Sequence, residues 1–330
     1  MARFSRLLGG VFAMHALFVV GCAAPTPTPT VTLAPAPAVG TPREPVAQKV
    51  ADGVYLLRGV PGEPDADTLG RVGNAGFIVG ETGVIAIDMG VSYLHGVALL
   101  KAIQKVTDLP VRLALVTQTH QEFLFGAAAY REAGIPIQMQ RKAAELMAAR
   151  CDNCLKTLKR VLGDDEMRGT TMFKPDQVFD DPPLLTLIGR PVQVLYFGLS
   201  SGPGNIAVFD RTSGVLFAGG LVDHLRIPDV QDGELPAWHA ALKALRALPP
   251  STVVPGHGPA TGADSIQTVQ RYLTRLEGRV LELIRSGAAL SDVPDAADLP
   301  EFKDWDQYDI IHRRNASVLF VRMERDQMFK

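Results

Sequence analysis

Two cysteines separated by two residues are the side chains whose types and spacing most plainly suggest chemistry. The motif Cys151-x-x-Cys154 opens the amphipathic stretch Leu155–Leu162. Such a pair supplies two thiolates, which is half of a structural zinc site. In an exported protein the same spacing favours a local disulfide, and a thioredoxin-like redox role is a further alternative. We expect the disulfide between Cys151 and Cys154.

The elements that must position such residues are short β-branched runs alternating with amphipathic stretches. The pattern predicts helices near 92–106, 123–133, 141–162, 235–247, 264–287 and 306–330. It predicts strands near 54–58, 76–79, 84–87, 111–116, 184–188, 191–197, 205–210, 214–218 and 252–254. Mixed elements of this kind indicate an α/β or α+β domain with stacked sheets and outer helices. Two of the hairpins, Asn74–Asp88 and Asn205–Gly220, resemble one another, but only the first ends in an acid.

Polar segments that follow the predicted strands resemble landmarks of the metallo-β-lactamase superfamily. The segment Thr117–Phe123 reads TQTHQEF and is similar to the family's T-H-x-H-x-D-H loop. Other landmarks stand in the family's order: Asp88-Met89-Gly90, Gly202-Pro203-Gly204-Asn205 and Pro255-Gly256-His257-Gly258. The resemblance spans about residues 49–262. It implies a four-layer αββα sandwich, followed by a C-terminal helical extension, with the site at one sheet edge.

The resemblance also implies one or two zinc ions, which activate water for hydrolysis. Residue by residue, only His120, Glu122 and His257 keep a ligand type at the family's positions. Gln118 and Ser201 are neutral, poor zinc ligands. The remaining family-equivalent positions are Phe123, Gly220 and Asp88. The resemblance therefore implies a degenerate zinc site.

Two interpretations of the retained residues follow. In the first, His120, Glu122 and His257 still hold one metal ion, helped by Asp88 or His224. In the second, the three are hydrogen-bonded polar residues under a pocket, and a phenylalanine ring fills the space of a lost metal. We favour the second interpretation, so zinc, the cofactor of the family, is expected to be absent or weakly bound.

A narrower branch of the family is similar in two further segments, Cys151–Pro175 and Trp305–Glu324. That branch consists of exported zinc metallohydrolase-like proteins associated with quinoprotein dehydrogenase and sulfur-oxidation (SoxH-like) systems. The similarity implies a periplasmic redox protein as a partner. Within the second segment, His312 and Asn315 are expected to brace the last helix, and a role in the site is the alternative.

The first residues resemble an export signal. Arg3 and Arg6 precede an apolar run, Leu7–Val20, which is too short for a comfortable transmembrane helix and suits a secretory signal. The run ends in Gly21-Cys22, which is similar to a bacterial lipobox. We expect a lipoprotein-type signal peptide over residues 1–22, a lipid anchor on Cys22, and an outer-membrane lipoprotein on the periplasmic face. A plain signal peptide is the alternative.

The composition of the chain limits its class of fold and of partner. Seven of the 24 prolines fall in residues 23–48, among Ala and Thr, which predicts an extended tether. The chain has 330 residues, 47% apolar and 21% charged, as in a soluble protein with a core. A net charge of −2 argues against nucleic acid as the main partner, and three cysteines exclude a small disulfide-framed fold.

Together these patterns predict a domain plan and a function. A metallo-β-lactamase-like domain would occupy residues 49–262, and residues 263–330 would form helices packed on it. The expected function is that of an exported metallo-hydrolase-family lipoprotein that is weakly active or non-catalytic. The alternative is a periplasmic binding or accessory protein for a redox system. No pattern in the sequence identifies a substrate.

Overall fold

The structure is a computed structural model and describes residues 41–328. All of these residues fall within one compact unit. The expected signal peptide, Cys22 and the tether as far as residue 40 lie outside the described residues. Residues 41–48 of the expected tether are described. The first strand, β1, begins at Ala47, so the end of the segment assigned to the tether belongs to the folded unit.

Twelve strands are arranged in two sheets within the described part of the chain. The seven-stranded sheet has the order β1-β2-β3-β4-β5-β6-β7. Its strands are β1 (Ala47–Ala51), β2 (Val54–Leu57), β3 (Ala75–Val79), β4 (Val84–Ile87), β5 (Val111–Leu115), β6 (Ile137–Gln140) and β7 (Gln177–Phe179). The five-stranded sheet has the order β12-β11-β10-β9-β8. Its strands are β8 (Leu184–Leu185), β9 (Val192–Tyr196), β10 (Ile206–Asp210), β11 (Val215–Gly219) and β12 (Thr252–Pro255).

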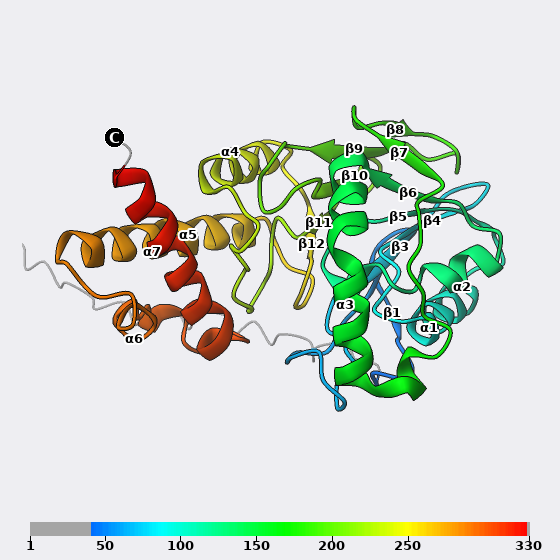
Figure 1. The fold of residues 1–330 in the computed structure, drawn as a ribbon. Helices are drawn as coiled ribbons and strands as arrows, with labels where there is room; N and C mark the ends of the chain where they lie inside the picture. Colours follow the sequence, from blue (N-terminus) through cyan, green and yellow to red (C-terminus); the bar gives the residue numbers. More distant parts are fainter. Residues whose placement is uncertain (1–40, 329–330) are drawn as a thin grey trace, which may run out of the picture. The chain divides into compact units, whose positions relative to one another are not determined.

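Helices alternate with strands from β4 to β7 and from β11 to β12, and helices alone follow β12 in the described residues (Figure 1). The α-helices are α1 (Tyr93–Gln104), α2 (Ala127–Glu132), α3 (Arg141–Met167), α4 (Leu235–Arg246), α5 (Asp264–Arg285), α6 (Val293–Ala296) and α7 (Arg313–Met328). Three shorter turns are η1 (Gln121–Phe123), η2 (Pro300–Phe302) and the π-helical η3 (Tyr308–His312). In α3 the helical backbone is interrupted at Gly163, whose φ is +81°.

Strand periodicity produces the layers. Successive side chains point to opposite faces of a sheet, so alternate residues enter different cores. In β4, Ile85 and Ile87 pack between the sheets, while Val84 and Ala86 pack under the outer helices. In β11, Val215 and Phe217 face the first sheet, and Leu216 and Ala218 face the helices on the other side. The expected four-layer αββα sandwich is confirmed.

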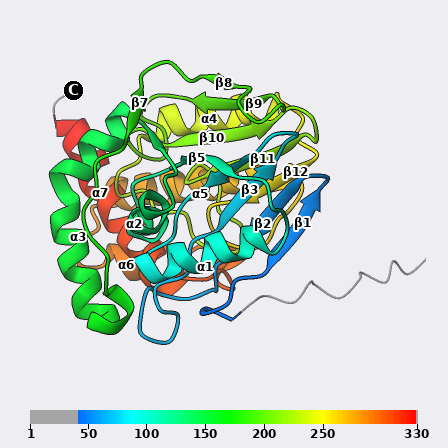
Figure 2. The ribbon, with the colours of Figure 1, turned by 90° about the vertical axis from the view of Figure 1, so that its right-hand side faces the viewer.

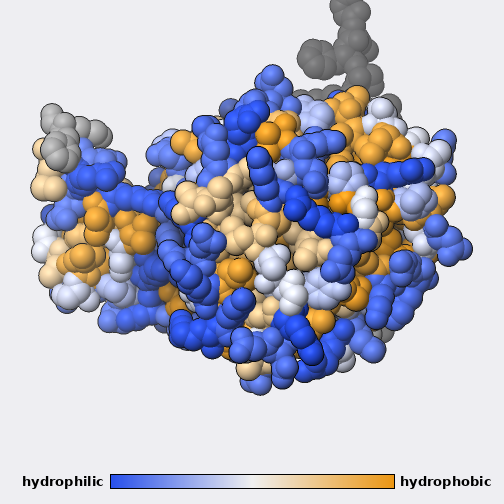
Figure 3. Space-filling view, turned by 45° about the vertical axis from the view of Figure 1, so that its right-hand side comes forward, coloured by the Kyte–Doolittle hydropathy of each residue, from blue (hydrophilic) through white to orange (hydrophobic). Residues whose placement is uncertain are grey.

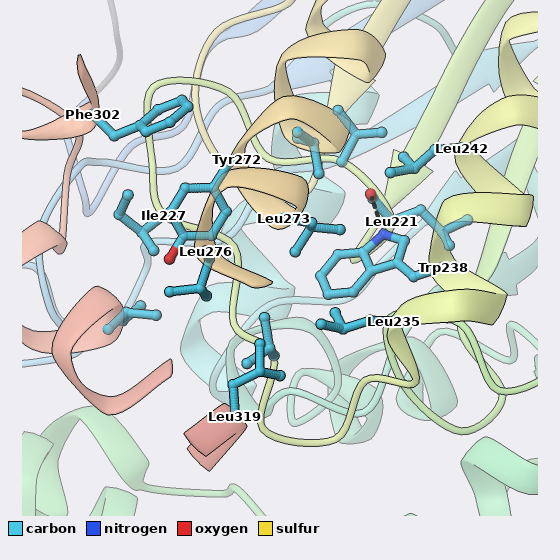
Figure 4. Close-up of a cluster of buried hydrophobic side chains, with 14 of the residues drawn as sticks. Leu221, Ile227, Leu235, Trp238, Leu242, Tyr272, Leu273, Leu276, Phe302 and Leu319 are labelled. Atoms are coloured by element: carbon cyan, nitrogen blue, oxygen red, sulfur yellow. Dashed lines mark hydrogen bonds between the residues drawn. The ribbon is translucent and has the colours of Figure 1, made fainter. Parts of the chain in front are cut away.

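Each outer helical layer has its own core. Residues of α1, α2 and α3 pack on the first sheet, and Figure 2 shows α1 in front of its strands. Residues of α4 and α5 pack on the second sheet, and α7 packs on α5 and α6 and completes the same core. Figure 4 shows Trp238 of α4 at this core, where its ring N–H donates to the carbonyl of Leu221 at 2.9 Å. The C-terminal helices thus extend the core of the second sheet.

The two similar hairpins stand in corresponding places. The β3–β4 hairpin leads through α1 into β5, which pairs parallel to β4. The β10–β11 hairpin leads through α4 into β12, which pairs parallel to β11. The same hairpin–helix–strand unit therefore occurs once in each sheet.

The outer surface is mixed in character. The face in Figure 3 interleaves hydrophilic and hydrophobic residues. Within residues 41–328 no helix is long and apolar enough to cross a membrane.

Candidate functional site

The candidate site lies where strands β5, β11 and β12 end. Glu122 follows β5, Asp223 follows β11, and His257 follows β12. Because β11 and β12 run parallel, their carboxyl ends meet at one edge of the second sheet. The segment after β5 crosses to that edge and brings Glu122 to His257, from 135 residues away.

His257 is held between two carboxylates. Its Nδ1 lies 2.8 Å from Oδ1 of Asp223, and its Nε2 lies 3.1 Å from Oε1 of Glu122. All three side chains are less than a tenth exposed. When both ring nitrogens donate, the imidazole is protonated, and each carboxylate then faces a positive charge. Both donor positions of the ring are therefore taken up by the protein itself.

The electrostatics of this triad are consistent with an ion pair. Burial alone lowers the pKa of His257, but the charge of Asp223 and the hydrogen bonds to both carboxylates outweigh it and raise the pKa. Burial alone raises the pKa of Glu122, but the hydrogen bond with His257 and the nearby charges of both histidines lower it to about 2. The geometry thus favours a charged Glu122–His257–Asp223 triad.

A cavity of about 390 Å³ opens beside the triad. His120, Glu122 and His257 all line it, so the structure brings together the three residues that retain a ligand type. The wall also has an apolar part, to which Leu146, Ile227 and Ile311 contribute. The cavity can therefore accommodate a molecule with one polar and one apolar portion.

Asp223 is the site residue that the sequence did not single out. It lies three positions past Gly220 and directly before His224. His224 is half-buried with an unpartnered Nδ1, and it does not line the cavity. The only sequence signal for Asp223 is that an acidic residue follows the strand β11. That signal does not indicate that the side chain contacts His257.

Three of the remaining family-equivalent positions, Gln118, Ser201 and Gly220, do not line the cavity. Gln118 is 1% exposed, and neither atom of its amide has a hydrogen-bond partner. Ser201 accepts a hydrogen bond from Nδ2 of Asn205 at 2.9 Å. A Cβ atom at Gly220 would lie 2.4 Å from Oε1 of Gln118. Gln118 therefore occupies the space that a longer side chain at Gly220 would need.

Phe123 and Asp88 are both buried. The Phe123 ring meets the His257 ring edge-on, with 5.2 Å between centroids. Asp88 accepts hydrogen bonds from the backbone N–H and the hydroxyl of Thr117, at 2.8 and 2.7 Å. Burial raises the pKa of Asp88 to about 7, although both of these hydrogen bonds act in the opposite direction. Asp88 thus braces the start of the loop after β5, outside the cavity lining.

The donor set can be compared with what zinc requires. A catalytic zinc site uses three protein ligands and an open position. Glu122 and His257 meet at 3.1 Å, and Asp223 contacts only the other ring nitrogen of that imidazole. Within residues 41–328 no group of three His, Cys, Asp or Glu side chains is placed to hold a metal ion. The described residues do not fit the zinc centre that the family uses.

The two cysteines of α3 line the same cavity. Their sulfurs are 3.2 Å apart, and both are free thiols. Cys151 is buried and Cys154 is partly exposed. The hydrogen bond with Cys154 raises the pKa of Cys151, and the same hydrogen bond lowers the pKa of Cys154 to about 7. The disulfide between them stays a prediction.

His312 and Asn315 act as contacts of the last helices. His312 bonds the Tyr272 hydroxyl and the carbonyl of Ala297, both at 3.0 Å. Asn315 donates to the carbonyl of Pro228 at 2.7 Å and accepts from the N–H of Val230 at 3.1 Å. These contacts fasten the loop next to the cavity wall, and neither side chain lines the cavity.

Comparison with known proteins agrees with this architecture. The profile of the metallo-beta-lactamase superfamily matches residues 68–257, more than half of the chain. The chain therefore belongs to the metallo-beta-lactamase superfamily, a family of hydrolases that typically depend on zinc.

Curated relatives cover parts of the chain. A stretch of 106 residues is 30% identical to the metallo-beta-lactamase type 2 of Bacteroides fragilis, over 31% of this chain and 43% of that protein. The linear primary-alkylsulfatase of a Pseudomonas species is 24% identical over 256 residues, which is 66% of this chain and 48% of that protein. The chain spans about half the length of the curated relatives it matches.

Solved structures share the fold. A metallo-beta-lactamase from Pontibacter korlensis superposes with a TM-score of 0.58 at 21% identity, covering 70% of this chain and 99% of that one. The DIM-1 metallo-beta-lactamase exposed to ceftazidime gives a TM-score of 0.55 at 16% identity, covering 70% of this chain and 97% of that one. At these identities the likeness concerns the fold alone.

Proposed function

We propose that this protein uses its cavity to bind a small organic molecule and has little or none of the zinc-dependent hydrolysis of its family. The observation that carries the proposal is the placement of His257 between Asp223 and Glu122. Zinc binds only a neutral imidazole, so the metal must displace the proton that both carboxylates stabilise. The same triad can bind a polar group of a ligand at the end of the cavity.

The cavity lining suggests the class of ligand. His120, Glu122 and His257 form a polar end, and Leu146 and Ile227 belong to an apolar part. The cations on the wall are largely balanced: Arg150 pairs with Asp232 at 2.7 Å, and Arg314 with Asp229 at 2.6 Å. One relative is named for linear primary alkyl sulfates, which combine a polar head with an apolar chain. We infer an amphiphilic small molecule as the ligand.

Metal content tests the proposal that zinc-dependent hydrolysis is weak or absent. The full chain, dialysed against zinc and then against buffer, is expected to retain well under one zinc per chain by mass spectrometry. A stoichiometric zinc that is lost in His120→Ala or in His257→Ala contradicts the proposal. His239→Ala is the matched control, because this histidine pairs with Glu277 on the surface of the helical layer and lies outside the cavity.

A gain-of-metal variant sharpens that test. Gln118→His, Phe123→His, Ser201→His and Gly220→Asp together restore the family's ligand types. Gln118 has to change together with Gly220, because its amide fills the space next to the glycine. We expect the fourfold variant to retain zinc where the parent does not. Equal zinc content in both would show that the replaced positions do not limit metal binding.

Assays of turnover and of ligand binding test the proposal that the cavity binds a small molecule without hydrolysing it. Wild-type protein is expected to show no turnover above buffer of an alkyl sulfate, a β-lactam, a thioester or a lactone. It is expected to bind a medium-chain alkyl sulfate measurably by calorimetry, and Leu146→Asp, a change at a partly exposed position of the apolar wall, is expected to weaken that binding strongly. Turnover that His257→Ala removes would instead establish a hydrolase.

We further propose that the protein is exported and anchored through Cys22. The apolar run before Gly21-Cys22 supports this proposal. Cys22→Ala is expected to move the protein from the membrane fraction to the soluble fraction, and continued membrane association would contradict lipidation. Docking to a periplasmic redox protein is the corresponding proposal for a partner, and co-purification from the periplasm with and without Cys22 tests it.

A further inference from the structure

We propose that Cys151 and Cys154 form a thiol–disulfide exchange site that opens into the cavity and takes small organic disulfides. Both cysteines line the cavity, and their sulfurs are 3.2 Å apart. This inference does not depend on what binds next to His257.

The two cysteines lie on the face of α3 that lines the cavity. Leu146, Arg150, Cys151 and Cys154 line the cavity, at spacings that place them on one face of α3. Residues three apart on a helix are neighbours, and the Cα separation that results suits a disulfide without movement of the backbone. The pair can therefore open and close while α3 stays in place.

Exposure assigns different roles to the two sulfurs. Cys151 is 2% exposed, so an incoming molecule cannot reach it first. Cys154 is partly exposed on the cavity side. A reactive thiol is accessible and has its thiolate stabilised, and the neighbouring Cys151 thiol does this most for Cys154, with smaller contributions from Arg150 and His120. Cys154 is therefore the attacking sulfur, and Cys151 is the resolving one.

The reaction proceeds in two steps. The Cys154 thiolate attacks one sulfur of R–S–S–R; a Cys154–S–S–R bond forms, the S–S bond of the substrate breaks, and R–S⁻ leaves and takes a proton from solvent. Cys151 then releases its proton to solvent and attacks Cys154 Sγ, which forms the intramolecular disulfide and expels the second R–S⁻. The dithiol is oxidised by two electrons and the substrate is reduced to two thiols. Excess thiol reverses both steps.

Stoichiometry and rate test the assignment, with dithiodipyridine as the probe. The full chain carrying Cys22→Ala, reduced and desalted, is expected to release two thiopyridones per chain and to end with no bound probe. Adding Cys151→Ser is expected to release one thiopyridone and to leave one bound as a mixed disulfide. Adding Cys154→Ser instead is expected to slow the reaction at least tenfold, because only the buried sulfur remains. Circular dichroism melting checks that each variant is folded.

Three results would overturn the proposal. The first is an equal reaction rate of the two serine variants. The second is a Cys151–Cys154 disulfide that excess glutathione fails to reduce, which would indicate a structural disulfide only. The third concerns the route of entry. Leu146→Trp narrows the cavity and is expected to slow the reaction several-fold, whereas Lys159→Trp, exposed elsewhere on α3, is not. Equal rates in these two variants would place the exchange outside the cavity.

Discussion

The two sides of the candidate site differ in how their polar groups are satisfied. On the histidine side (Glu122, Asp223 and His257), every ring nitrogen faces a carboxylate within 3.1 Å. On the glutamine side (Gln118, Ser201 and Gly220), the amide of Gln118 is buried with no partner. Glu122 and His257 on the one side, and all three residues on the other, stand at positions equivalent to the family's metal ligands. The polar side chains of both sides are buried, and the two sides differ in whether their polar atoms have hydrogen-bond partners.

The difference shows that burial of polar groups is tolerated when they partner one another and is costly when they do not. A buried ion pair with good hydrogen bonds keeps its charges balanced without a metal. A buried amide without partners costs about 1–3 kcal/mol for each unsatisfied group. The charges of the histidine side are therefore balanced by contacts within the protein, whereas the glutamine side carries an unfavourable buried amide. Four predictions test this contrast, from the largest expected effect to the smallest.

The largest effect is expected from breaking the histidine side. His257→Ala leaves Glu122 and Asp223 buried without their shared partner, which should lower the free energy of unfolding by about 3–5 kcal/mol. Urea denaturation at pH 7 measures this loss. His239→Ala breaks a more exposed pair with Glu277 and should cost less than about 1 kcal/mol. Similar losses in the two variants would remove the distinction between the triad and a surface pair.

Asp88, which braces the loop between the two sides, should give the stability a pH dependence. Its pKa is raised from 3.8 to about 7 in the folded protein, so the unfolded chain loses this proton first as pH rises. Stability should therefore fall between about pH 4 and pH 7, by up to about 4 kcal/mol. Asp88→Asn keeps a side chain that tolerates the observed φ of +60° and should remove this part of the slope.

Denaturation across pH 4–8 measures the Asp88 effect as the difference between the two profiles. Asp304→Asn, at an exposed position, is the control and should keep the wild-type profile. Parallel profiles for wild type and Asp88→Asn would mean that Asp88 is ionised throughout this range.

A smaller effect is expected from crowding the glutamine side. Gly220→Ala places a Cβ atom 2.4 Å from Oε1 of Gln118 and should cost about 1–3 kcal/mol. In a Gln118→Ala background the same substitution should cost much less, because the crowding atom is gone. A double-mutant cycle gives this coupling. Additive losses would show that Gln118 moves aside without cost.

The smallest effect, and the only stabilising one, is expected from removing the unpartnered amide. Gln118→Met keeps a similar volume without the buried polar atoms and should raise the free energy of unfolding by about 1–2 kcal/mol. Gln193→Met is the control, because Gln193 already accepts a hydrogen bond from Arg211 at the surface. Loss of stability in Gln118→Met would indicate that the amide has a partner, such as a bound water.

Much of the fold could be predicted from sequence periodicity. The strands of both hairpins and the long helices fall within a few residues of the expected positions, since their apolar spacing is strong. Strands β1, β6 and β7 were missed. In β6, the polar residues Gln138 and Gln140 are buried, so no run of apolar residues marks this strand in the sequence. The expected strand at 184–188 is reduced to the two residues of β8, and the last helix begins with the π-helical η3.

The site was harder to predict because its contacts are long-range. Local order places His120, Glu122 and His257 after strands, and the structure brings all three to one cavity. No local pattern indicates that Asp223 meets His257, or that the Cys151–Cys154 pair lies on the same cavity wall. Both arrangements depend on how the loops after the strands and the helix α3 come together in the folded chain.

The repeated hairpin–helix–strand unit has a consequence for the order of folding. Each unit pairs strands that are close in sequence, so each can form at a low entropic cost of loop closure. The contact between Glu122 and His257 joins the two units across 135 residues and requires both to have docked. We therefore expect the site to be the last part of the molecule to assemble, after both sheets have formed.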